Sequence, residues 1–160
     1  MSAEDNKAAV QHMGEEAFNK GNLEVLDELV AQDVVDHDPA PGQPPGREGI
    51  KQFVSELRTA FPDLQLAIEN MVAEGEYVAF NYTINGTHQG EFMGIEPTGK
   101  QVSVKAMEMV RIAGGQMVDR WGNTDQLGLL EQLGALPPIG QDEEEEKGPL
   151  DKAKDKLMGN

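Results

Sequence analysis

A carboxylate at the junction of two structural patterns is a strong candidate for chemistry in this chain. Asp125 follows Trp121, the only tryptophan, by four residues, where a strand pattern changes to a helix pattern. It can cap that helix by accepting hydrogen bonds from the first free N–H groups, as aspartate often does. It can equally serve as a general acid or base, because a partly apolar pocket beside an indole ring disfavours the charged form of a carboxylate. The spacing leaves both roles open.

Glu108 is a second candidate, because it interrupts a strand face that is otherwise apolar from Val102 to Ile112. An unpaired charge on such a face would be costly. The glutamate therefore faces a solvent-filled pocket, has a buried partner, or is turned outward by a bulge. If Glu108 and Asp125 meet across a cavity, they form a pair of carboxylates of the kind used in acid–base catalysis. We expect Glu108 to contact a ligand there.

His37 stands between two carboxylates, Asp36 and Asp38, just before residues 39–46, which hold four prolines and two glycines. A segment of that composition is stiff and extended and cannot be a helix or a central strand. We expect no metal at His37, because no second, spaced pair of ligands accompanies it. The histidine either lies at the mouth of a pocket or holds the proline-rich segment by hydrogen bonds, and the sequence does not separate the two.

The elements that position these residues follow from a change of hydrophobic period near position 61. Before it, helical spacing of apolar residues predicts helices at 4–19, 23–30 and 47–60. After it, the alternation of apolar and polar residues predicts four long strands. One begins at position 64, the next two span 77–87 and 102–112, and the last runs through Trp121. A short helix follows Asp125.

Helices gathered before an antiparallel sheet are typical of an α+β fold. We expect the three N-terminal helices to pack in a strongly curved antiparallel sheet of about four long strands. Such a cone-shaped barrel encloses a cavity that suits a small apolar ligand with a few polar anchors.

Length and composition indicate one domain, at residues 1–138, followed by an acidic tail at 139–160. The tail contains a run of acidic residues and a stretch, 150–158, with the spacing of a short amphipathic helix; we expect it to be flexible. Cysteine is absent, which excludes disulfides and thiolate chemistry.

The net charge of −16 lies mostly on the body of the protein, because residues 141–160 combine seven acidic residues with four lysines. A field of this sign repels phosphate backbones, so we expect no nucleic-acid partner. It is also compatible with a salt-rich cytoplasm. The chain has neither a transmembrane apolar run nor a signal-peptide pattern, so a cytoplasmic location without membrane attachment is the expectation.

Four motifs resemble one known family. They are F-P-D-L at 61–64, G-T-H-Q-G-E-F-M-G at 86–94, P-T-G-K at 97–100 and W-G-N-T-D-Q-L-G-L-L-E-Q-L-G at 121–134. Together they resemble the SnoaL-like polyketide cyclases, also called ester cyclases, which have the nuclear transport factor 2-like α+β cone fold. The resemblance covers about residues 5–136.

The resemblance implies an intramolecular aldol condensation that closes a ring in a polyketide methyl ester, without metal or cofactor. It implies that Asp125 is the general acid/base, since that residue matches the acidic position of the family's Trp-x-x-x-Asp motif. His37 and His88 match positions where histidine is common, and we expect them to bind or polarise a carbonyl. Trp121 and Phe92 would form walls of the pocket.

Two further expectations concern partners and alternatives. We expect a small hydrophobic ligand with a carbonyl group, and a homodimer formed through the open face of the sheet, where Met107 and Met109 would lie. A non-catalytic binding protein, in which Asp125 is only a cap, is the main alternative. An isomerase or hydrolase with the same pocket is another.

Overall fold

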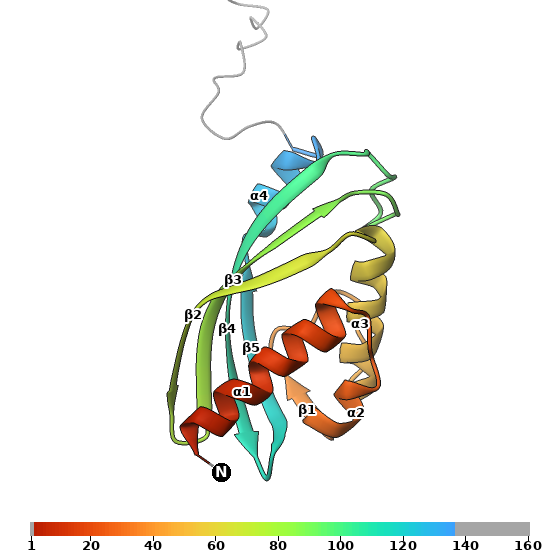
Figure 1. The fold of residues 1–160 in the computed structure, drawn as a ribbon. Helices are drawn as coiled ribbons and strands as arrows, with labels where there is room; N and C mark the ends of the chain where they lie inside the picture. Colours follow the sequence, from red (N-terminus) through yellow and green to blue (C-terminus); the bar gives the residue numbers. More distant parts are fainter. Residues whose placement is uncertain (1, 137–160) are drawn as a thin grey trace, which may run out of the picture.

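One curved sheet of five strands organises the described part of the chain, residues 2–136, in the computed structural model (Figure 1). The helical elements are α1 (Ala3–Met13), the π-helix η1 (Gly14–Asn19), α2 (Val25–Leu29), α3 (Gly46–Ala60) and α4 (Gln126–Gln132). The strands are β1 (Val30–Asp36), β2 (Gln65–Glu74), β3 (Tyr77–Thr87), β4 (Gln101–Ala113) and β5 (Gln116–Thr124). The predicted α+β class is confirmed.

The sheet has the strand order β1-β5-β4-β3-β2. The four long strands, β2 to β5, pair with one another in antiparallel fashion, as predicted. Two tight turns connect these strands: β2 and β3 are joined at Gly75, and β4 and β5 at Gly114 and Gly115. All three glycines have positive φ angles, which tight hairpins require.

The prediction of four strands and of a helix over 23–30 was wrong in one respect. The helix α2 ends at Leu29, and Val30–Asp36 forms a fifth strand, parallel to β5. The sheet is therefore mixed. Val30 and Val34 are buried in this strand, where their β-branched side chains pack well. A strand that pairs with a segment more than 80 residues away leaves little trace in local spacing.

Helices α1, α2 and α3 lie on the concave side of the bent sheet, as Figure 1 shows. The stripe predicted for the helix at 47–60 is confirmed, since Ile50, Val54 and Leu57 of α3 are buried. One core cluster joins α1, α2 and α3 to the sheet, and a second joins the end of α3 to β4 and α4. The sheet and α3 thus form two walls of a hollow.

The predicted tail at 139–160, with its short amphipathic helix, lies outside the described residues. Within residues 2–136, every helix is too short or too polar for a membrane span.

Candidate functional site

A cavity of about 760 Å³ opens between α3, the proline-rich segment at 39–45 and the concave face of the sheet. Ligand pockets in proteins commonly enclose about 300–1,000 Å³. Most of its wall is apolar, and the apolar lining includes Phe53, Leu57, Phe61, Ile84, Phe92, Val102, Val104 and Leu129. Along β4 the lining changes from valines to Glu108, so the cavity has a polar end.

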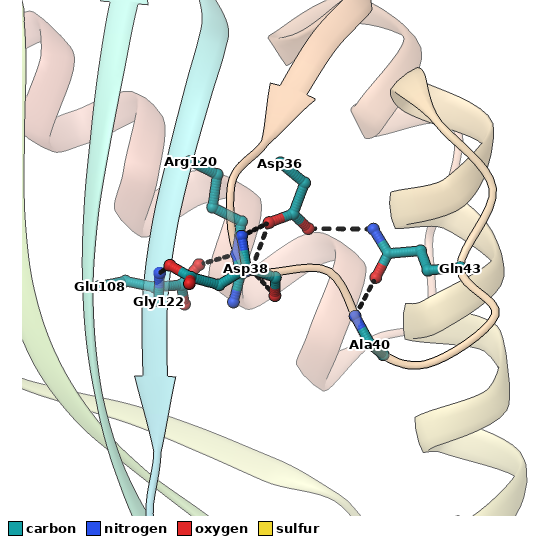
Figure 2. A network of polar contacts seen from close by, with 7 residues as sticks. All are labelled: Asp36, Asp38, Ala40, Gln43, Glu108, Arg120 and Gly122. Atoms are coloured by element: carbon teal, nitrogen blue, oxygen red, sulfur yellow. Dashed lines mark hydrogen bonds and ion pairs between the residues drawn. The ribbon is translucent and has the colours of Figure 1, made fainter.

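Arg120 of β5 organises this polar end (Figure 2). Its Nε donates to Glu108 of β4, and its Nη1 donates to Asp36 Oδ1 at 2.9 Å. The three side chains are only 17%, 13% and 9% exposed, in the order Arg120, Glu108 and Asp36. Charges this far from water persist when they are paired and hydrogen-bonded. These two ion pairs link the end of β1, which carries Asp36, and β4, which carries Glu108, to Arg120 of β5.

Asp36 extends the network to the proline-rich segment. Gln43 donates from Nε2 to Asp36 Oδ2 at 2.9 Å and accepts from the Ala40 N–H at 3.1 Å (Figure 2). The Asp38 N–H donates to Asp36 Oδ1 at 3.1 Å. Both oxygens of Asp36 therefore have partners, and the segment after β1 is held against the cavity.

Asp38 also lines the cavity, but its carboxylate is bound differently. Oδ2 accepts from the Gly122 N–H at 2.9 Å, and the Asp38 carbonyl lies 3.4 Å from Arg120 Nη1. Among the described residues, Asp38 Oδ1 has neither a hydrogen bond nor an ion pair. This oxygen is free to meet a ligand.

The charges of the network affect two neighbouring groups. Burial disfavours the charged form of Arg120, but Glu108 and Asp36 outweigh that effect and raise the pKa of the guanidinium. Burial, followed by the negative charge of Glu108, raises the pKa of Tyr82, while Arg120 opposes the rise. Tyr82 lines the cavity and therefore presents a protonated hydroxyl, which can donate a hydrogen bond to a carbonyl oxygen.

Two of the predicted site residues line the cavity. Glu108 faces it and also has a buried partner, Arg120, so two of its three alternatives hold together. The bulge alternative does not, because β4 pairs with β3 and β5 in unbroken register at Glu108. Phe92 forms part of the wall and packs edge-on against Phe61, with 5.5 Å between ring centroids.

Asp125 is placed elsewhere. Its Oδ1 accepts from the Gly128 N–H at 3.0 Å, so the capping role is confirmed. The side chain is exposed and does not line the cavity that holds Glu108. The structure therefore does not bring the two predicted carboxylates together, and the catalytic role of Asp125 stays a prediction.

His37 and Trp121 lie together on the outer face of the sheet. Their rings are stacked, with centroids 4.4 Å apart and planes 1° from parallel. His37 Nε2 lies 3.0 Å from Asp119 Oδ1, and this contact, with Arg111, lowers the pKa of Asp119. Neither ring lines the cavity. Alternation explains the placement, since Asp119 and Trp121 point away from the face that carries Arg120.

His88 is fully buried and does not line the cavity either. The Thr98 N–H donates to His88 Nδ1 at 3.2 Å, and Thr98 Oγ1 lies 3.0 Å from the same nitrogen. The ring also packs against Phe61, a cavity wall, at 5.5 Å. His88 thus holds the loop between β3 and β4, which carries Phe92. Its role in binding a carbonyl stays a prediction.

The residues that sequence reasoning missed are Asp36, Asp38, Gln43, Tyr82 and Arg120. A signal for the aspartates was present, because residues at i and i+2 of an extended segment share a face opposite the residue between them. By this rule Asp36 and Asp38 lie on the same face of the chain, and His37 lies on the opposite face. A buried partner was one of the three alternatives for Glu108, but nothing in the spacing identified Arg120 as that partner.

A bent sheet that closes with helices around a cavity with one charged end defines an α+β cone protein of the nuclear transport factor 2-like class. Comparison with known proteins agrees. The family model of the SnoaL-like polyketide cyclases matches residues 8–133, so the chain belongs to this family.

Individual relatives support the assignment. Nogalonic acid methyl ester cyclase of Streptomyces nogalater is 30% identical over 122 residues, which are 74% of this chain and 90% of that protein. The structure of IdmH from Streptomyces antibioticus is 35% identical, with a TM-score of 0.71, and the match covers 81% of this chain and 98% of that one. The structure of TsrD from Streptomyces laurentii is 27% identical, with a TM-score of 0.78, and the match covers 85% of this chain and 99% of that one.

Proposed function

We propose that this protein catalyses an intramolecular aldol condensation on a small hydrophobic carbonyl compound bound in the cavity. The observation that carries the proposal is a cavity of about 760 Å³ with apolar walls and with carboxylates, a guanidinium and a protonated phenol at one end. The family and a relative named for methyl ester cyclisation support the reaction class.

The chemistry requires groups that this cavity contains. A carboxylate removes a proton from a carbon between two carbonyls, and the resulting enolate is delocalised, so a modest base suffices. The enolate carbon then attacks a second carbonyl carbon. Hydrogen bonds from Tyr82 and Arg120 would stabilise the negative oxygen that develops. Each step is a proton transfer or a carbon–carbon bond formation, which side chains can promote without a cofactor.

A second candidate function is binding without catalysis. One observation favours it: Asp125, the residue that the family resemblance makes catalytic, is an exposed helix cap outside the cavity. The two functions differ in whether a bound ligand is converted.

The test uses nogalonic acid methyl ester, the compound in the name of the relative. We expect the wild-type protein to convert it to a cyclised isomer of unchanged mass and altered retention, measured by liquid chromatography and mass spectrometry. Glu108→Gln should lower the rate at least about tenfold, because it breaks the pair with Arg120 beside the ligand.

The Asp125→Asn variant tests whether the general acid/base is Asp125 or a carboxylate inside the cavity. Asparagine is as good a cap as aspartate, so this variant should fold normally. Conversion at the wild-type rate would place the chemistry in the cavity, whereas loss of conversion with retained binding would make Asp125 the general acid/base. Binding of the ester by the wild type without conversion would support the second function, and absence of binding would contradict both.

A further inference from the structure

We propose that Asp38 is the general base of the cavity and, once protonated, its general acid. The inference rests on the proposed function, because it names the residue that performs the proton transfers. Three carboxylates, from Asp36, Asp38 and Glu108, meet at the polar end, and the network of hydrogen bonds distinguishes them.

Asp36 and Glu108 are committed to structural partners. Asp36 accepts hydrogen bonds from Arg120, Gln43 and the Asp38 N–H. Glu108 is paired with Arg120 Nε. Protonation of either carboxylate would break a largely buried ion pair and leave the guanidinium short of a partner. Both carboxylates are therefore engaged in holding Arg120 in place.

Asp38 has no such constraint. Its single side-chain hydrogen bond within residues 2–136 comes from the Gly122 N–H, and no cation pairs with it. Oδ2 is thereby anchored while Oδ1 remains free at the wall of the cavity. Uptake of a proton on Oδ1 would leave the anchoring hydrogen bond and the Arg120 pairs in place.

Asp38 is an exposed residue, but its main chain and one of its carboxylate oxygens are held by their surroundings. Its N–H is bound to Asp36, its carbonyl lies near Arg120 and the next residue is Pro39, which stiffens the main chain. Its anchor, Gly122, belongs to β5 and cannot carry a side chain without displacing others, since a Cβ there would lie 2.5 Å from Arg120 Nη2 and 3.0 Å from Glu108 Cγ. A base held in this way meets the positioning that catalysis demands.

The proposed steps balance without any further reactant. Asp38 Oδ1 takes the proton from the carbon between two carbonyls, and the electron pair of that C–H bond forms the enolate. The enolate carbon forms a bond to the second carbonyl carbon, whose π electrons move to its oxygen. That alkoxide takes the proton from Asp38, which returns to its carboxylate form. The product is an isomer of the substrate.

The test measures the proton-transfer step on a simple probe, methyl benzoylacetate, which carries an aromatic ring and an activated methylene group. Deuterium exchange of that methylene in D₂O is followed by proton NMR, and binding of the probe is followed by saturation-transfer NMR. Asp38→Asn can still accept the Gly122 N–H, so it removes the base and keeps the anchor. Asp33→Asn, an exposed position on β1, is the matched control.

We expect the wild type and Asp33→Asn to accelerate exchange equally. Asp38→Asn should bind the probe with an affinity within about threefold of the wild type and lose acceleration by about 100-fold or more, the usual contribution of a general base. Asp38→Glu keeps the carboxylate and serves as a second variant if Asp38→Asn does not fold; it should retain part of the activity.

The outcomes separate the inference from the proposed function. Exchange at the wild-type rate in a folded Asp38→Asn protein would overturn the role of Asp38 and leave the cavity's acid–base function standing. If the wild type binds the probe without accelerating exchange, or does not bind it, the proposed function fails and the inference fails with it.

Discussion

At the scale of single residues, Arg120 is the side chain on which the polar end of the cavity depends. It serves Glu108 and Asp36, which come from different strands, and both are mostly buried. A guanidinium suits this position because its fork of donors can bind two carboxylates at once. Without it, two like charges would face each other with little access to water.

Removal of Arg120 should therefore destabilise the protein. Arg120→Met keeps much of the apolar stem, and we expect the free energy of unfolding in urea to fall by about 3 kcal/mol, as when one partner of a buried ion pair is lost. Arg111→Met on the outer face, where the pairs with Glu76 and Asp119 are more exposed, should cost about 1 kcal/mol or less. Equal losses in the two variants would contradict the importance of burial.

At the scale of elements, a loop carboxylate that accepts two hydrogen bonds ties the start of β2 to the end of β3. Asp63 lies just before β2 and accepts from both the N–H and the hydroxyl of Thr87, the last residue of β3, each at 2.7 Å. The hydroxyl bond, followed by the backbone bond, lowers the pKa of Asp63. This contact holds the hairpin that carries Tyr82 and Ile84 into the cavity wall.

The Asp63 contact should make stability depend on pH in a defined direction. Because the pKa is lower in the folded state, the stabilisation is present above the unfolded-state value of about 3.9 and disappears as the pH falls through the folded-state value. The difference in unfolding free energy between wild type and Asp63→Asn, measured by urea denaturation, should be constant above about pH 5 and shrink below about pH 4. A constant difference for Asp63→Asn down to pH 2 would contradict the assignment.

At the scale of the whole molecule, the outer face of the sheet exposes a group of apolar side chains on a strongly acidic protein. Val72 and Met107 are 68% and 67% exposed, and Tyr77 and Met109 lie beside them on the same face. We propose that a second copy of the chain covers this surface. Two molecules with a net charge of −16 repel each other, so contact between them is favoured where exposed apolar side chains can be buried.

Association through this face should respond to one added charge. We expect the wild type to elute as a dimer, and Met107→Glu as a monomer, in size-exclusion chromatography with light scattering. Ser55→Glu, which adds the same charge at an exposed position on α3, should remain dimeric. Added salt should strengthen the wild-type dimer, because it screens the repulsion between the two copies. A monomeric wild type, or a dimeric Met107→Glu protein, would exclude this interface.

Local patterns in the sequence were enough to predict most elements. The stripe of α3, the alternation of β3 and β4, the turns at Gly75 and Gly114 and the cap at Asp125 all depend on residues close together in the chain. Short-range geometry decides such features, so spacing and residue type carry the information. The motifs at 61–64, 86–94, 97–100 and 121–134 also identified the family correctly.

The composition of the site was decided by the tertiary structure. β1 pairs with β5 from the far end of the chain, and Asp36 meets Arg120 across 84 residues of sequence. The same pairing and the alternation along each strand direct Asp36, Asp38 and Arg120 into the cavity and leave His37 and Trp121 outside it. Sequence alone determined which residues could form strands and which could do acid–base chemistry. Which of these residues share a cavity depends on long-range strand pairing. The register with the partner strands decides which face of the sheet each side chain points to, and neighbours in the chain do not.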